Sequence, residues 1–272
     1  MQRIIVFYLL YTVQPLKAQE LFVFTESASN MATSGAGIRL NNAFMKVTKS
    51  ARTEYLLIPE LMFGVSKKLM LHGAVFFSNE GGTRFGFNGG SIYGKYRFYS
   101  EDEVHSHFRM AIFEKISTNN GIIQQPAIDL NGYNSGYETG MVFTKLLNKI
   151  ALSTSFAFLH ATDNSGHHIF NYGASRRNAI GYSLSAGKLL LPKEYTSYRQ
   201  VNLNAMLELL GQVNAGSCLG YLDAAPSLQL IINSVMRIDL GAKIALISKL
   251  QRTAPGGCFV RVEYNLFNLF KK

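Results

Sequence analysis

The stretch EYLLIPELMFGVSKKLMLHGAVFF, residues 54–77, carries apolar side chains at every second position on both sides of the polar turn Ser66-Lys67-Lys68. The apolar positions are Tyr55, Leu57, Pro59, Leu61, Phe63 and Val65 before the turn, and Leu69, Leu71, Val75 and Phe77 after it. A period of two places alternate side chains on opposite faces of a β-strand, whereas a helix repeats every 3.6 residues. The stretch therefore predicts two antiparallel strands joined by a tight turn.

The same period continues to the C-terminus. Phe108, Met110 and Ile112 alternate with Arg109, for example. About twelve such segments are expected, each roughly ten residues long, a length that suits a strand crossing a bilayer at a tilt. Their predicted ranges are 36–46, 54–65, 69–79, 88–99, 107–117, 136–146, 150–161, 178–191, 199–211, 226–233, 236–248 and 257–269.

The composition separates a membrane barrel from its alternatives. Charged residues make up 16% of the 272 residues, and aromatic residues 12%. A soluble β-sandwich of this size would carry more Lys and Glu on its surface. No apolar run of about 18 residues follows the N-terminus, which argues against membrane-spanning helices. Lipid cannot satisfy a free strand edge, so the sheet must close. We expect an all-β protein, a transmembrane antiparallel up-and-down β-barrel of about 12 strands.

The first 18 residues, MQRIIVFYLLYTVQPLKA, have the pattern of an export signal. Arg3 precedes an apolar core from Ile4 to Val13, Pro15 breaks the helix, and Ala18 offers a small residue before a cut. The predicted domains are a signal peptide at 1–18, a periplasmic N-terminal segment at 19–35 and the barrel at 36–272. Segment 19–35 forms either a periplasmic strand or a plug inside the lumen.

The connections between the expected strands alternate in length. Those near 66–68, 147–149 and 234–235 are tight, and 100–106 and 193–198 are moderate. Those near 80–87, 118–135, 162–177, 212–225 and 249–256 are longer. Short turns on one rim and longer loops on the other are typical of outer-membrane barrels. The expected location is the outer membrane, with the long loops extracellular and both termini periplasmic.

Charged side chains fall on the face of the strands that would point into the lumen. The expected lumen-lining residues are Arg39, Glu60, His72, Lys95, Arg97, Arg109, Lys115, Glu138, Glu208, Arg237, Asp239, Lys243, Arg261 and Glu263. As a pore wall, their positive excess would favour anionic solutes. Alternatively, they fill a narrow lumen with ion pairs, since only larger barrels leave a wide channel.

Other side chains suggest chemistry only weakly. His105 and His107 share a strand face and could ligate a metal, but they fall in a predicted periplasmic turn, and a solvated turn is the favoured interpretation. His160, Asn164 and Ser165 have a faint likeness to an outer-membrane phospholipase motif, although the spacing does not match. We expect no enzyme activity, no metal site and no cofactor.

The expected partners are outer-membrane lipid, the barrel-insertion machinery during assembly, and small solutes. The aromatic C-terminal strand, ending Leu266-Phe267-Asn268-Leu269-Phe270-Lys271-Lys272, resembles the signal which that machinery reads. The formal net charge of +10 does not indicate a nucleic-acid partner, because the basic residues are scattered. Cys218 and Cys258 either pair near the outer rim or remain free thiols.

Three stretches carry a resemblance to a known family: ELFVFTESASNMATSGAGIRL (20–40), IPELMFGVSKKLMLHGAVFFSN (58–79) and GGSIYGKYRFYSEDEVHSHFRMA (89–111). They resemble exported barrel proteins of Bacteroidota, similar to porin-like transporters associated with phenol-degradation gene clusters. Most such proteins have no defined function, so the resemblance implies a barrel and no particular substrate. The expected function is porin-like passage of small solutes. The alternatives are a closed-lumen scaffold, adhesin or accessory subunit and, less favoured, a lipid hydrolase.

Overall fold

The computed structural model describes residues 22–48, 50, 52–80, 84–103, 106–192 and 200–267. The expected signal peptide, His105 and residues 268–272 lie outside the described residues. In the described part of the chain, no helix is long and apolar enough to cross a membrane.

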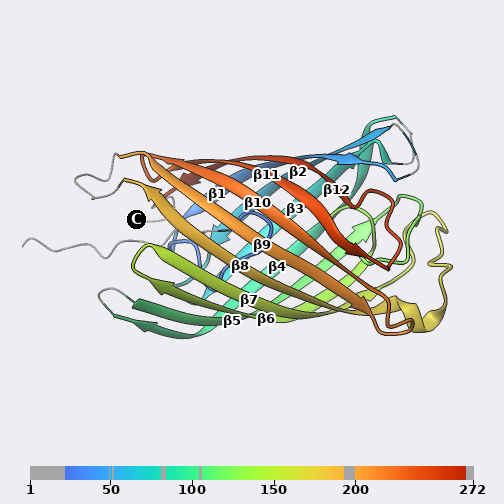
Figure 1. The fold of residues 1–272 in the computed structure, drawn as a ribbon, viewed down its shortest axis with the longest axis horizontal. Coiled ribbons are helices and arrows are strands. Elements are labelled where there is room, and N and C mark those ends of the chain that lie inside the picture. Colours follow the sequence, from blue (N-terminus) through green and yellow to red (C-terminus); the bar gives the residue numbers. More distant parts are fainter. Residues whose placement is uncertain are drawn as a thin grey trace, which may run out of the picture.

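Twelve antiparallel strands in the described residues form one closed barrel, which confirms the predicted fold class (Figure 1). The strands are β1 (Ala36–Lys46), β2 (Thr53–Gly64), β3 (Leu69–Ser78), β4 (Gly86–Asp102), β5 (Ser106–Asn119), β6 (Gly136–Leu147), β7 (Ile150–Ala161), β8 (Asn178–Leu191), β9 (Asn202–Asn214), β10 (Gly220–Ile232), β11 (Met236–Ser248) and β12 (Gly256–Leu266). A short 3-10 helix, η2 (Ala174–Arg177), precedes β8. Each strand pairs with its neighbours in the chain, and β1 pairs with β12 over its full length. The sheet therefore has no free edge.

The predicted ranges match the observed strands closely, with one clear exception. The range predicted for the tenth strand, 226–233, is wrong, because β10 begins at Gly220 and β9 continues to Asn214. The expected loop 212–225 is therefore only residues 215–219. Pro226 lies within β10 opposite Leu207 of β9, where the pairing of β10 with β11 is interrupted. A proline without an amide hydrogen is tolerated at such an interruption.

The barrel has two unlike ends. The turn rim comprises the connections 65–68, 103–105, 148–149, 192–201 and 233–235, and the loop rim comprises 47–52, 79–85, 120–135, 162–177, 215–219 and 249–255. The two longest connections, 120–135 and 162–177, lie on the loop rim as predicted. The expectation that every turn-rim connection is shorter than every loop-rim connection is wrong, because 192–201 on the turn rim is longer than four of the loop-rim connections.

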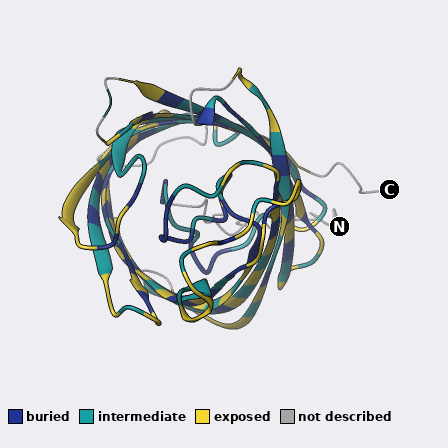
Figure 2. Ribbon diagram, turned by 90° about the vertical axis from the view of Figure 1, so that its right-hand side faces the viewer, coloured by how far each residue is buried: buried dark blue, intermediate teal, exposed yellow. Residues whose placement is uncertain are grey.

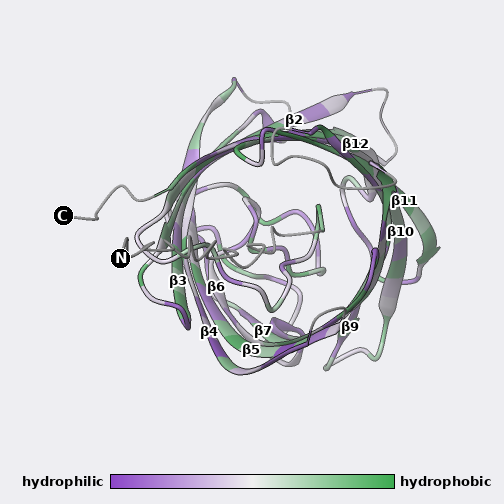
Figure 3. Cartoon of the chain, turned by 90° about the vertical axis from the view of Figure 1, so that its left-hand side faces the viewer, coloured by the Kyte–Doolittle hydropathy of each residue, from purple (hydrophilic) through white to green (hydrophobic). Residues whose placement is uncertain are grey.

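The outer wall is mainly apolar, and the alternation is visible along the strands when the barrel is viewed from the turn rim (Figure 3). Ile92 is 70% exposed and Phe156 is 55% exposed. Leu57, Phe77, Phe108, Leu203 and Leu240, apolar residues of five different strands, are each exposed or half-buried. An apolar exterior on a closed strand cylinder is the arrangement expected in lipid.

An outward-facing carboxylate on β5 departs from this pattern. Glu114 is exposed on β5, between the exposed Ile112 and Ile116 of the same strand face. A carboxylate on the lipid face of a barrel is destabilising, although less so than a cation.

Candidate functional site

The lumen contains a stretch of the chain that precedes β1. Figure 2, viewed from the loop rim, shows buried chain inside the ring of strands. We call residues 22–31 the lumen segment. Phe22 packs on Ala151 of β7 and Met206 of β9, whereas Glu26 reaches Arg39 on β1. Because β1 and β7 are half a ring apart, the lumen segment crosses the barrel interior.

The carboxylate of Glu208 holds this segment by its backbone. One oxygen accepts the N–H groups of Val23 and Phe24, each at 2.9 Å, and the other accepts the N–H of Thr25 at 2.8 Å. The Thr25 hydroxyl donates to the same carboxylate at 2.7 Å. Glu208 is fully buried, so these donors replace the water that the charge has lost.

Further contacts come from strands around the ring. Lys95 of β4 donates to the carbonyl oxygen of Ser27 at 2.6 Å, and the hydroxyl of Thr144 on β6 accepts the N–H of Ala28 at 2.9 Å. Arg109 of β5 donates to Ser29 Oγ at 2.9 Å. Sequence analysis left two arrangements open for residues 19–35, a periplasmic strand and a plug inside the lumen. The contacts of residues 22–31 are those of a segment inside the lumen.

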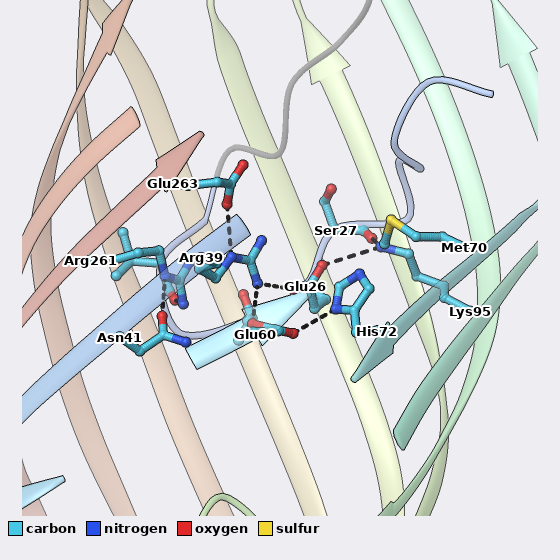
Figure 4. A network of polar contacts seen from close by, with 12 residues as sticks. Glu26, Ser27, Arg39, Asn41, Glu60, Met70, His72, Lys95, Arg261 and Glu263 are labelled. Carbon is cyan, nitrogen blue, oxygen red and sulfur yellow. Dashed lines mark hydrogen bonds and ion pairs between the residues drawn. The ribbon is translucent and has the colours of Figure 1, made fainter. Parts of the chain in front are cut away.

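An ion-pair network surrounds Arg39, as Figure 4 shows. The Arg39 guanidinium lies 3.0 Å from Glu26, 3.2 Å from Glu60 and 2.7 Å from Glu263. Glu60 also contacts His72 Nδ1 at 2.7 Å. Arg39 and Glu263 are almost fully buried, so this group fills the interior rather than lining open solvent.

The network continues along β11 and β12. Arg237 contacts Glu263 at 2.9 Å and Asp239 at 3.2 Å, and Arg261 lies 3.8 Å from Asp239. Arg261 also donates to Asn41 Oδ1 and to the carbonyl oxygen of Val23. With Lys95 included, the connected group has four cations and four carboxylates: Arg39, Lys95, Arg237, Arg261, Glu26, Glu60, Asp239 and Glu263.

The other residues expected in the lumen occupy separate places. Arg97 donates to the carbonyl oxygen of Lys67 at the turn rim. Arg109 also pairs with Asp102 at 2.7 Å. Lys115 and Glu138 line one cavity and Lys243 lines another.

A loop enters the lumen from the opposite rim. The Gln212 side chain accepts the N–H of Ile128 at 2.9 Å and donates to its carbonyl oxygen at 2.7 Å, which fixes loop 120–135 against β9. Ile128 and Leu130 are buried in a cluster with Leu159 of β7. This insertion was not predicted, since nothing local in the sequence reports a contact 84 residues away.

Asn164 ties this loop to loop 162–177. Its amide donates to the carbonyl oxygens of Gly121 and Tyr133 at 2.9 and 3.0 Å, and its oxygen accepts the N–H of Ser135 at 2.7 Å. Asn164 is therefore a structural cross-link. His160, another residue of the hydrolase-like motif, contacts Asn178 Oδ1 at 2.7 Å.

Several buried charges near the loop rim were also missed. Arg252 forms a two-point ion pair with Asp223, and its guanidinium lies 3.8 Å from the ring centroid of Tyr221. Asp223 lies in the part of β10 that was predicted as loop. An extended alternation upstream of Pro226 would have placed Asp223 on the inner face.

Glu80, just beyond β3, is buried beside other acids. Burial and the nearby Glu54 and Asp129 raise the pKa of Glu80 to about 8. The Tyr133 hydroxyl donates to Glu54 at 3.3 Å. In the described residues, no group of three or more His, Cys, Asp or Glu side chains is arranged to hold a metal. Cys218 and Cys258 are exposed and not bonded to each other.

Two adjoining cavities remain inside the barrel. The loop-side cavity has a volume of about 190 Å³ and lies between the lumen segment and loop 120–135. The mid-barrel cavity, of about 230 Å³, lies against the inner faces of β1 to β7. Their linings share Phe24, Asn41, Ile58, Asn131 and Arg261. The lumen is thus narrowed but not completely filled.

Solved structures of outer-membrane proteins are similar to this chain. The crystal structure of an outer membrane channel from Pseudomonas putida F1 superposes with a TM-score of 0.60 at 11% identity, covering 90% of this chain and 100% of that one. This chain is therefore similar in fold to that channel. A structure described as the KdgM porin superposes with a TM-score of 0.46 at 10% identity, and the match covers 84% of this chain and 98% of the porin chain.

Sequence comparisons add nothing to this. No protein-family model matches the chain, and no curated protein matches it. At 11% identity, the likeness to the Pseudomonas channel concerns the fold alone.

Proposed function

We propose that this protein is a non-enzymatic outer-membrane channel that lets small solutes pass through the lumen. The observation that carries the proposal is the pair of adjoining cavities, each lined by both polar and apolar side chains, inside a closed barrel with an apolar exterior. Their small volumes imply that only small solutes fit while the lumen segment is in place. The lumen segment and loop 120–135 then act as the constriction.

The charge of the lumen supports at most a weak preference for anions. The fourteen lumen residues predicted from sequence include eight Lys or Arg side chains and five carboxylates. Glu26 of the lumen segment adds another carboxylate, and Asp102 offsets Arg109. The cation excess that remains is small, and a small excess gives a weak field.

The proposed orientation has the loop rim outside the cell and the turn rim in the periplasm, because short turns face the periplasm in bacterial barrels. Proposed partners are outer-membrane lipid and, during assembly, the barrel-insertion machinery. A signal peptide at 1–18 and a place among the Bacteroidota barrel proteins remain predictions from the sequence.

Swelling of liposomes that contain the purified protein tests the proposal. Small neutral and charged solutes should enter the liposomes at rates that fall steeply with solute size. A matched preparation without protein gives the baseline. Absence of protein-dependent swelling and of single-channel current would refute passage.

The alternative with specific support is a barrel whose lumen stays closed. It rests on the buried, charge-balanced network between the lumen segment and Arg39. Under that alternative the protein acts through its loops as a scaffold, adhesin or accessory subunit. It then carries no ion current, either as the natural chain or after the lumen segment has been released.

A further inference from the structure

The wall of the mid-barrel cavity is electrically neutral overall. Its charged lining residues are Glu26, Arg39, Glu60, Lys115, Glu138 and Arg261, three of each sign. The cavity therefore has no net charge with which to select an anion or a cation. Selectivity must come from how its individual groups are arranged.

Two of these charges differ from the rest. Arg39, Glu26 and Glu60 are joined in ion pairs, and Arg261 lies beside Asp239. Among the described residues, Lys115 and Glu138 take part in no ion pair. Glu138 has no hydrogen bond within the described part of the chain either, whereas Lys115 donates to the Asn131 side chain of loop 120–135.

Lys115 and Glu138 lie directly opposite each other on paired strands, at the register Lys115↔Glu138 of β5 and β6. Both line the mid-barrel cavity. A cation and an anion thus face the same small space without being joined to each other. A solute that carries both charges can satisfy the two groups together.

One ring nitrogen of a histidine in the cavity wall has no protein partner. His72 is 4% exposed, and its Nε2 has no hydrogen-bond partner in the described structure, while its Nδ1 contacts Glu60. A buried ring nitrogen without a partner is costly unless a ligand or water supplies a hydrogen bond.

The remaining wall is apolar and limits the ligand's size. Phe76, Phe113 and Ile58 line the cavity beside the polar groups. A volume of about 230 Å³ has room for about eight water-sized groups, at about 30 Å³ each. A small aliphatic amino acid has about that many non-hydrogen atoms and carries both charges.

We propose that the mid-barrel cavity is a binding site for a small zwitterion, an α-amino acid with an aliphatic side chain. Its ammonium group is bound by Glu138, its carboxylate by Lys115, and its side chain packs on Phe76 and Phe113. This inference rests on the proposed function, because a binding site inside a channel confers selectivity on passage.

Ligand-observed NMR titration of the purified full-length protein in detergent tests the site. The probe is L-valine, and the competitors are isobutylamine, isovalerate and xylose, which carry only a positive charge, only a negative charge and no charge. Valine should bind saturably, and at least about tenfold more tightly than each competitor, a ratio expected when one charge-assisted contact is lost.

Two substitutions assign the charges. Lys115→Met should remove the preference for valine over isobutylamine, and Glu138→Gln should remove the preference over isovalerate. The matched control is Glu114→Gln, one residue from Lys115 on β5 but on the outer face; it should change neither preference. A loss of global folding would not remove one preference and leave the other intact.

Equal affinity for all four probes, or preferences unchanged in both variants, would overturn the zwitterion site. Liposome swelling separates this failure from failure of the proposed function. Swelling without saturable valine binding refutes the site and leaves the channel, whereas valine binding without swelling refutes the channel and leaves the site.

Discussion

Substitution of Glu208 by alanine should release the lumen segment. The carboxylate accepts three backbone N–H groups and the Thr25 hydroxyl, all within 2.9 Å. Hydrogen bonds to a charged group contribute about 1.5–3 kcal/mol each, so four contacts at the low end give about 6 kcal/mol. At about 1.4 kcal/mol per factor of ten, the ratio of seated to released segment should fall by about 10⁴.

Labelling of an introduced cysteine measures this ratio. Ser27 is 1% exposed, so the thiol of a Ser27→Cys variant should react with a water-soluble maleimide only when the segment leaves the lumen. Cys218 and Cys258 are exposed and must first be replaced by serine. Labelling in the Glu208→Ala background should be much faster, and single-channel current should rise in parallel.

The control for this experiment is Glu114→Ala, which removes an outward carboxylate of the same type. It should leave the labelling rate of the introduced thiol unchanged. If Glu208→Ala also leaves that rate unchanged while the barrel remains folded, then Glu208 does not hold the segment and the reasoning is wrong.

Three further outcomes are expected. Asn164→Ala removes three hydrogen bonds between loops, at a cost of about 2–4 kcal/mol, and should make loop 120–135 sensitive to protease; unchanged cleavage would contradict the cross-link. Because the pKa of Glu80 is raised to about 8, the folded protein keeps a proton that the unfolded chain loses above about pH 4.5. Stability should therefore fall as pH rises from about 4.5 to 8. In Glu80→Gln, the unfolding midpoint should change less with pH over that range. If the midpoint changes with pH equally in the natural protein and the variant, the expectation is wrong. Glu114→Leu should raise the stability of the barrel in lipid by about 1 kcal/mol, measured by reversible denaturant unfolding, whereas a loss would show that the carboxylate has a partner in the membrane.

The sequence predicted the wall of this barrel better than its contents. Alternation of apolar and polar side chains reports which face of a strand meets lipid, and the ranges 36–46, 150–161 and 178–191 match the observed strands to the residue. Pro226 misled the prediction of β10, because a proline commonly marks a strand end and here occupies an interruption in the pairing.

The contents of the lumen depend on contacts between residues far apart in the sequence, which the alternation of apolar and polar residues does not predict. Glu208 binds Val23 across 185 residues, and Gln212 binds Ile128 across 84. Residues 19–35 join an apolar run, Leu21 to Phe24, to a small and polar run, a pattern equally compatible with a periplasmic strand and a buried plug. The charge balance also escaped prediction, because Glu26 joins the network from outside the strands.

The lumen segment has a consequence for how this chain assembles. Its contacts reach Lys95, Arg109, Thr144, Glu208 and Arg261, which belong to five strands distributed around the circumference. A segment that is hydrogen-bonded to five strands can bring those strands together before β1 pairs with β12. Deletion of the lumen segment, residues 22–31, should therefore hinder ring closure during biogenesis, even though every residue of the wall would still be present.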